Sequence, residues 1–108
     1  MSDEESYVQV IDEKELEEGK MKLVRVDGTP VLFIKKNSKI YVIDNRCPHM
    51  GVGLSGGNLD DNFVVCPSHE WRFSLETGEY EHDPSYKLVA YPFKIKEGKI
   101  WVKVEEDF

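Results

Sequence analysis

The last part of this chain alternates apolar and polar residues in the pattern of a β-hairpin. Phe93 and Ile95 alternate with lysines, Glu97-Gly98 interrupts the pattern, and residues 100–104 resume it. A period of two predicts strands with one buried face, and the intervening Glu-Gly predicts a tight turn. This stretch is therefore predicted to be a half-buried antiparallel pair of strands.

Shorter runs of the same character occur along the rest of the chain. Strands are predicted at residues 7–11, 21–26, 31–35, 40–43 and 63–65, and turns at Asp27-Gly28, at residues 36–39 and at Thr77-Gly78. Asp12 is a good helix cap, so a short helical turn is predicted through Leu16, ended by Gly19. The glycines of residues 50–59 indicate tight turns rather than a helix. Because no stretch shows sustained helical periodicity, the predicted fold class is all-β.

Length and charge narrow the class of protein. The 108 residues suit one domain, and the net charge is −7, from 14 basic and 21 acidic residues. Nucleic acids and anionic membrane surfaces attract basic faces, so neither is an expected partner. The acidic start does not resemble a signal peptide, and the apolar run at residues 31–34 is too short to span a bilayer. We therefore expect a soluble, cytoplasmic protein with no membrane partner.

Two short segments carry the candidate chemistry. They read Cys47-Pro48-His49 and Cys66-Pro67-Ser68-His69, and they use both cysteines of the chain. The order C-x-H, sixteen residues, then C-x-x-H resembles that of the Rieske family of [2Fe–2S] proteins. The resemblance implies one [2Fe–2S] cluster per chain, with Cys47 and Cys66 on one iron and His49 and His69 on the other.

Other interpretations of the four residues stay open at this point. A structural zinc site usually reads C-x2-4-C followed by H-x3-5-H, which this order fits poorly. A Cys47–Cys66 disulfide needs an oxidising compartment, which nothing in the chain indicates. The Rieske interpretation is therefore preferred to zinc and to a disulfide.

The resemblance covers nearly the whole chain and implies a more detailed fold. An incomplete antiparallel barrel or sandwich, built from about residues 1–45 and 85–108, is expected to form a base subdomain. A smaller cluster-binding subdomain is expected at about residues 46–84. Pro84 falls where the family has a proline-containing loop over the cluster, and His82 is interpreted as a surface residue.

Departures from the family pattern indicate which kind of Rieske protein this is. High-potential members have an extra cysteine in each ligand loop, where this chain has Val52 and Ser68. They also place hydroxyl side chains at the positions of Trp71 and Phe73, and those hydroxyls bond to cluster sulfurs. Without such hydrogen bonds the reduced state is less stable, so a low potential, near about −150 mV, is predicted. Glu70 stands where the ferredoxins usually have glycine.

The resemblance therefore predicts an electron carrier and not an enzyme. It implies one-electron transfer from a flavin-dependent ferredoxin reductase to a terminal oxygenase, with no catalytic residue required. One alternative is the small subunit of an assimilatory nitrite reductase, many of which lack the four ligands. Another is a structural or sensor module that uses the same Cys2His2 site.

Overall fold

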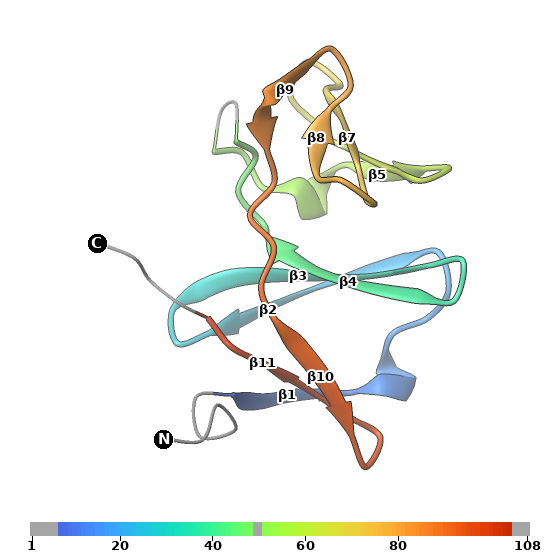
Figure 1. The fold of residues 1–108 in the computed structure, drawn as a ribbon, viewed down its shortest axis with the longest axis vertical. Helices are drawn as coiled ribbons and strands as arrows, with labels where there is room; N and C mark the ends of the chain where they lie inside the picture. The colour runs from blue at the N-terminus through green and yellow to red at the C-terminus, as the bar shows by residue number, and fades with distance from the viewer. Residues whose placement is uncertain (1–6, 49–50, 105–108) are drawn as a thin grey trace.

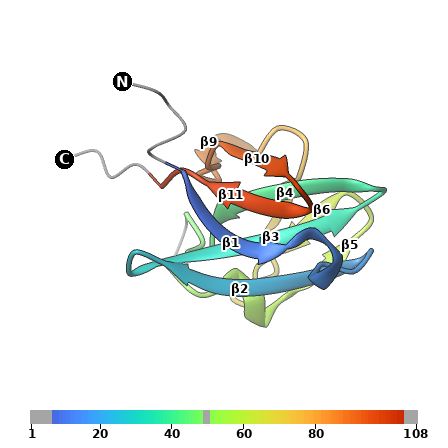
Figure 2. The ribbon, with the colours of Figure 1, turned by 90° about the horizontal axis from the view of Figure 1, so that it is seen from below.

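The computed structural model describes residues 7–48 and 51–104, which fold into three antiparallel sheets. Figure 1 shows the sheets one above another, and Figure 2 shows the first sheet lying over the second. The first has the order β1 (Val8–Asp12), β11 (Lys99–Val102), β10 (Phe93–Lys96), and the second β2 (Lys20–Val26), β3 (Thr29–Lys36), β4 (Lys39–Asp44). The third has the order β5 (Asn58–Asp60), β6 (Phe63–Val65), β7 (Arg72–Ser74), β8 (Glu79–Tyr80), β9 (Asp83–Lys87). The predicted all-β class is confirmed.

Helical structure in the described residues is confined to two 3₁₀ turns, Glu13–Glu15 and Leu54–Gly56. Asp12 caps the first, since its side chain and that of Glu15 form a capping box, as expected from a helix-capping residue. No helix in this part of the chain is long and apolar enough to cross a membrane.

The predicted hairpin turns are confirmed and have a common geometry. Asp27-Gly28, Asn37-Ser38 and Glu97-Gly98 each join two strands through two residues, and all six residues have positive φ. Two-residue hairpins with this backbone have a twist that matches the flanking strands. These turns fix the register of β2–β3, β3–β4 and β10–β11.

Strand β3, in the centre of the middle sheet, is buried on both faces, which explains its unbroken apolar run. Val31 and Phe33 face the first sheet, whereas Leu32 and Ile34 face the third, and all four are fully buried. A strand covered on both faces reads as a continuous hydrophobic run. We call the core between the second and third sheets the site-side core: Leu32, Ile34, Ile43, Cys47, Leu54, Val64, Cys66, Phe73, Leu75 and Leu88.

Some details differ from the expectation. Ile95, predicted to face the core, is exposed, because β10 is the edge strand of its sheet. Strands β5 and β9 were absent from the sequence pattern; β9 is mostly exposed and contains Pro84, which sheets tolerate at edges. The division into a base and a cluster-binding subdomain stays a prediction.

Candidate metal centre

The two cysteines lie side by side in the interior. Cys47 follows β4 and Cys66 follows β6, and the two side chains lie close enough that Cys47 raises the pKa of Cys66. Cys47 is 2% exposed and Cys66 is 0% exposed, and both are free thiols within the site-side core. Two segments that are distant in sequence therefore place two buried sulfur atoms in the same part of the core.

The first loop is closed by backbone hydrogen bonds on both sides of Cys47. The Cys47 N–H donates to the Val52 carbonyl at 2.8 Å, and the Gly51 N–H donates to the Cys47 carbonyl at 2.7 Å. Asn45, which is buried, accepts the Ser55 N–H through its side-chain oxygen at 2.8 Å. Cys47 is therefore held in a closed turn; His49, predicted as a ligand in the same loop, lies outside the described residues.

The second loop connects β6 to β7 and is closed at its base by the Cys66 N–H, which donates to the Trp71 carbonyl at 2.8 Å. His69 is exposed. His69 and Glu70 have φ values of 63° and 54°, so two consecutive non-glycine residues are left-handed. Among residues 7–48 and 51–104, no group of three or more His, Cys, Asp and Glu forms a metal site.

The environment of the Cys66 thiol combines opposing influences. Burial raises the pKa of Cys66, and so does the neighbouring Cys47, whereas the Ser68 N–H lowers it by hydrogen bonding to the sulfur. An apolar pocket by itself disfavours a thiolate, so a cationic centre is needed to stabilise deprotonated sulfurs here.

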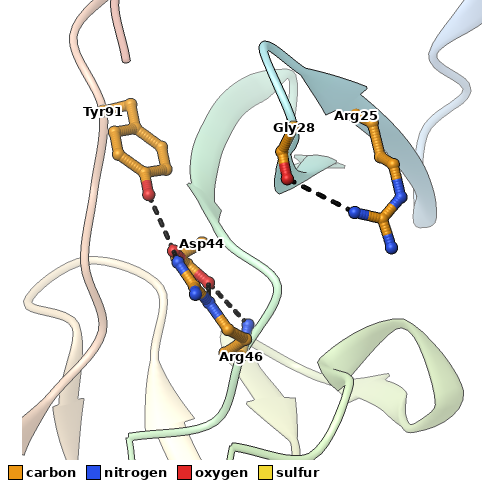
Figure 3. Close-up of polar contacts among 5 residues, drawn as sticks. All are labelled: Arg25, Gly28, Asp44, Arg46 and Tyr91. Atoms are coloured by element: carbon orange, nitrogen blue, oxygen red, sulfur yellow. Dashed lines mark hydrogen bonds and ion pairs between the residues drawn. The ribbon is translucent and has the colours of Figure 1, made fainter. Parts of the chain in front are cut away.

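A polar network stands immediately before the first loop. The buried Asp44 carboxylate accepts hydrogen bonds from the Arg46 backbone N–H at 2.8 Å, from Nε at 2.9 Å and from Nη2 at 2.6 Å. The Tyr91 hydroxyl donates to the same carboxylate at 2.7 Å (Figure 3). The network joins the chain that enters the first loop to the segment that returns toward β10.

The network shifts the ionisation of its members. Burial raises the pKa of Asp44, but the hydrogen bonds from Arg46 and Tyr91 outweigh it, so the pKa lies below the usual value. Burial and the hydrogen bond to Asp44 raise the pKa of Tyr91 to about 12. Asp44 is therefore a stable buried anion at neutral pH, and Tyr91 is its neutral donor.

A glycine brings the two halves of the site into contact. A Cβ atom on Gly57 would lie 1.9 Å from the Val65 carbonyl oxygen, directly before Cys66. Only a residue without a side chain permits this approach. The sequence indicated tight turns at this glycine-rich stretch but did not single out Gly57.

Other residues singled out from the sequence are placed as follows. Phe73 is fully buried in the site-side core, and Trp71 packs against that core while partly exposed. His82 is a surface residue, as expected, with Nε2 3.5 Å from a Glu81 carboxylate oxygen. Pro84 is exposed in β9, and its covering role stays a prediction.

Comparisons with known proteins agree with this arrangement. A family model described as Rieske [2Fe-2S] domain matches residues 6–92. The alkene monooxygenase system ferredoxin component of Xanthobacter autotrophicus (strain ATCC BAA-1158 / Py2) is 32% identical over 104 residues, which cover 95% of this chain and 85% of that protein.

Solved structures give the same result. The ferredoxin of carbazole 1,9a-dioxygenase from Nocardioides aromaticivorans IC177 has a TM-score of 0.81 at 25% identity, over 92% of this chain and 98% of that one. A chain in a complex of reduced oxygenase and oxidized ferredoxin in carbazole 1,9a-dioxygenase has a TM-score of 0.80 at 26% identity, over 94% of this chain and 96% of the matched one.

Proposed function

The chain belongs to the Rieske [2Fe–2S] domain family and holds one such cluster, and we propose that it carries single electrons from a flavin-dependent reductase to a terminal oxygenase. It is an electron-transfer component and not an enzyme, as are the ferredoxin components to which it is similar. The observation that carries the proposal is the pair of adjacent, buried, free thiols, Cys47 and Cys66, at the bases of two separate loops.

The proposed ligands are Cys47 and Cys66 on one iron and His49 and His69 on the other. Support comes from the donor set: two neighbouring thiols suit thiolate ligation, and the exposed imidazole of His69 suits an iron near the surface. When bound, the cluster supplies a centre that takes up and gives back one electron. The residues around it keep the two sulfur donors dry and leave the histidine side accessible to a partner.

The proposed reduction potential is low for this family. Phe73 is buried in the same core as the two cysteines, and neither it nor Trp71 offers a hydroxyl. Hydrogen bonds to a charged group are worth about 1.5–3 kcal/mol, and about 1.4 kcal/mol corresponds to roughly 60 mV for one electron. Even partial loss of two such bonds in the reduced state lowers the potential by on the order of 100 mV.

The proposed partners follow from the class of relative. A ferredoxin of carbazole 1,9a-dioxygenase has been solved together with its oxygenase, and we extend that kind of pairing to this chain. The reductase and a cytoplasmic location are part of the same proposal.

Reductive titration of the purified protein followed by EPR tests the proposal. A Rieske-type signal that appears at a clearly negative potential is expected. His69→Ala should abolish that signal, whereas His82→Ala, a matched change at a surface histidine, should retain it. A protein that contains zinc or no metal, or a His69→Ala variant with an unchanged signal, would contradict the ligand set. A signal at strongly positive potential would contradict the argument from Trp71 and Phe73.

A further inference from the structure

The second ligand loop has a backbone that its sequence does not favour. His69 and Glu70 are both left-handed, with φ values of 63° and 54°. Non-glycine residues rarely adopt this conformation, and consecutive ones persist only where the surrounding structure fixes them. Inside the loop, the Cys66 N–H donates to the Trp71 carbonyl and closes the base, so the backbone of Trp71 is directly connected to both ends of the loop.

Three aromatic side chains meet at the end of this loop. The Trp71 ring stacks on Tyr80, with ring centroids 3.8 Å apart and planes at 5°. Tyr86 meets Trp71 edge-on, at 5.1 Å and 82°. Tyr80 comes from β8 and Tyr86 from β9, so the first residue after the loop is held by two further strands. We call Trp71, Tyr80 and Tyr86 the aromatic clamp.

The aromatic clamp also contacts the site-side core, through Phe73. Phe73, fully buried in the site-side core, lies 6.3 Å from the Trp71 ring and 5.8 Å from the Tyr80 ring. Stacked and edge-to-face arrangements at these separations are favourable and have a preferred geometry. The indole of Trp71 is therefore fixed in orientation, and with it the backbone that carries the loop.

We propose that the aromatic clamp is a positioning device that holds the second ligand loop in its left-handed conformation. The clamp residues are not ligands; they act through the backbone of Trp71 on Glu70 and His69. The inference rests on the proposed function in one respect, that His69 lies on the cluster. Its structural part, that the clamp constrains the loop, is independent of any metal.

The first experiment compares Tyr80→Leu with Tyr80→Phe in the cluster-loaded protein. Leucine removes the stacked ring, whereas phenylalanine keeps it. Tyr80→Leu should broaden the EPR lines and shift the reduction potential, because His69 then samples several orientations; Tyr80→Phe should restore both. Tyr41→Leu is the control, since Tyr41 packs against the same core from β4. Equal EPR lines and potentials for all four proteins would overturn the proposal.

A second readout does not depend on the cluster spectrum. A glutamate-specific protease should cut after the exposed Glu70 about five-fold faster in Tyr80→Leu than in the wild type, since cleavage follows local opening. Glu97, in the β10–β11 turn, provides a reference site in the same molecule. Equal acceleration at both sites would mean general destabilisation and would overturn a specific role. Absence of a Rieske signal in the wild type, with selective cleavage at Glu70 in the variant, would overturn the proposed function and leave the clamp standing.

A third variant tests the cause. Glycine adopts positive φ without strain, so Glu70→Gly should make the loop less dependent on the clamp. In the Glu70→Gly background, Tyr80→Leu should broaden the EPR lines by less than half of its effect in the wild-type background. Equal broadening in the two backgrounds would show that the clamp does not act on the left-handed backbone.

Discussion

Asp44→Asn is the most direct test of the polar network that precedes the first ligand loop. The carboxylate receives four hydrogen bonds, three from Arg46 and one from the Tyr91 hydroxyl. An asparagine has the same shape but replaces one oxygen by an NH2 group, which faces at least one donor that cannot turn into an acceptor. The variant therefore loses both the charge and part of the hydrogen bonding.

The cost can be bounded from the contacts. A hydrogen bond to a charged group contributes about 1.5–3 kcal/mol. The Arg46 side chain is 60% exposed and water can solvate it again, whereas the Asp44 side chain is 6% exposed and cannot recover its partners. We expect Asp44→Asn to lower the free energy of unfolding by about 2–3 kcal/mol, close to one full charged hydrogen bond.

The assay is urea denaturation of the cluster-loaded proteins, followed in parallel by far-UV circular dichroism and by visible absorption. Asp60→Asn is the matched control, because Asp60 also pairs with an arginine, Arg72, but has 55% exposure. Exposed pairs contribute at most about 1 kcal/mol. If Asp44→Asn costs no more than Asp60→Asn, burial does not strengthen the network and the reasoning is wrong.

Tyr91→Phe separates the two halves of the network. It removes one hydrogen bond to Asp44 and leaves the arginine contacts. The Tyr91 hydroxyl donates to the Asp44 carboxylate oxygen that also accepts Arg46 Nη2. Because both substitutions disturb this same hydrogen bond, the effects of Asp44→Asn and Tyr91→Phe should be clearly less than additive in the double variant. Full additivity would show that Tyr91 and Asp44 stabilise the protein independently.

Three further changes test other parts of the site. Gly57→Ala forces a Cβ atom against the Val65 carbonyl and should lower the free energy of unfolding, measured by urea denaturation, by about 1–3 kcal/mol or more. Gly56→Ala, whose Cβ would meet only a proline carbon at 3.7 Å, should lower it much less. Phe73→Tyr should raise the reduction potential by tens of millivolts if the new hydroxyl reaches a ligand sulfur; an unchanged potential with an intact cluster would contradict the hydrogen-bond argument. The pKa of Tyr91, raised to about 12, exceeds its unfolded value of about 10, so the stability it contributes is complete below pH 10 and is lost as the pH rises toward 12. Stability measured across that range should fall less steeply in Tyr91→Phe than in the wild type.

The sequence predicted those strands and turns whose structure is determined by a single short segment of the chain. The apolar run of β3, the two-residue turns and the alternation of β11 depend on local sequence, and the structure confirms them. For the strands and turns the physical cause is local: turn geometry or a period of two. The shared site of Cys47 and Cys66 was instead implied by the family resemblance; the structure places both cysteines in one buried core, and the ligand set stays a prediction.

The parts that were missed depend on contacts between distant segments. Asp44 and Tyr91 are 47 residues apart, and neither has a periodic pattern that points to the other. Strand β9 is polar and contains a proline, so its sequence resembles that of a loop. Its pairing with β8 depends on where the rest of the fold places the two segments, which its own residues do not indicate. Such features require knowledge of which segments meet.

The two loops that we propose to hold the cluster are bordered by different kinds of contact, and this suits an electron carrier. The first is bordered by the charged network of Asp44, the second by the aromatic stack on Trp71, while both cysteines lie in one core with β3. A centre that changes charge without catalysing a reaction benefits from surroundings that are organised beforehand and need not rearrange. For the proposed ligand set, with His69 exposed, we therefore expect the loops around Cys47 and Cys66 to rearrange little when the cluster is reduced.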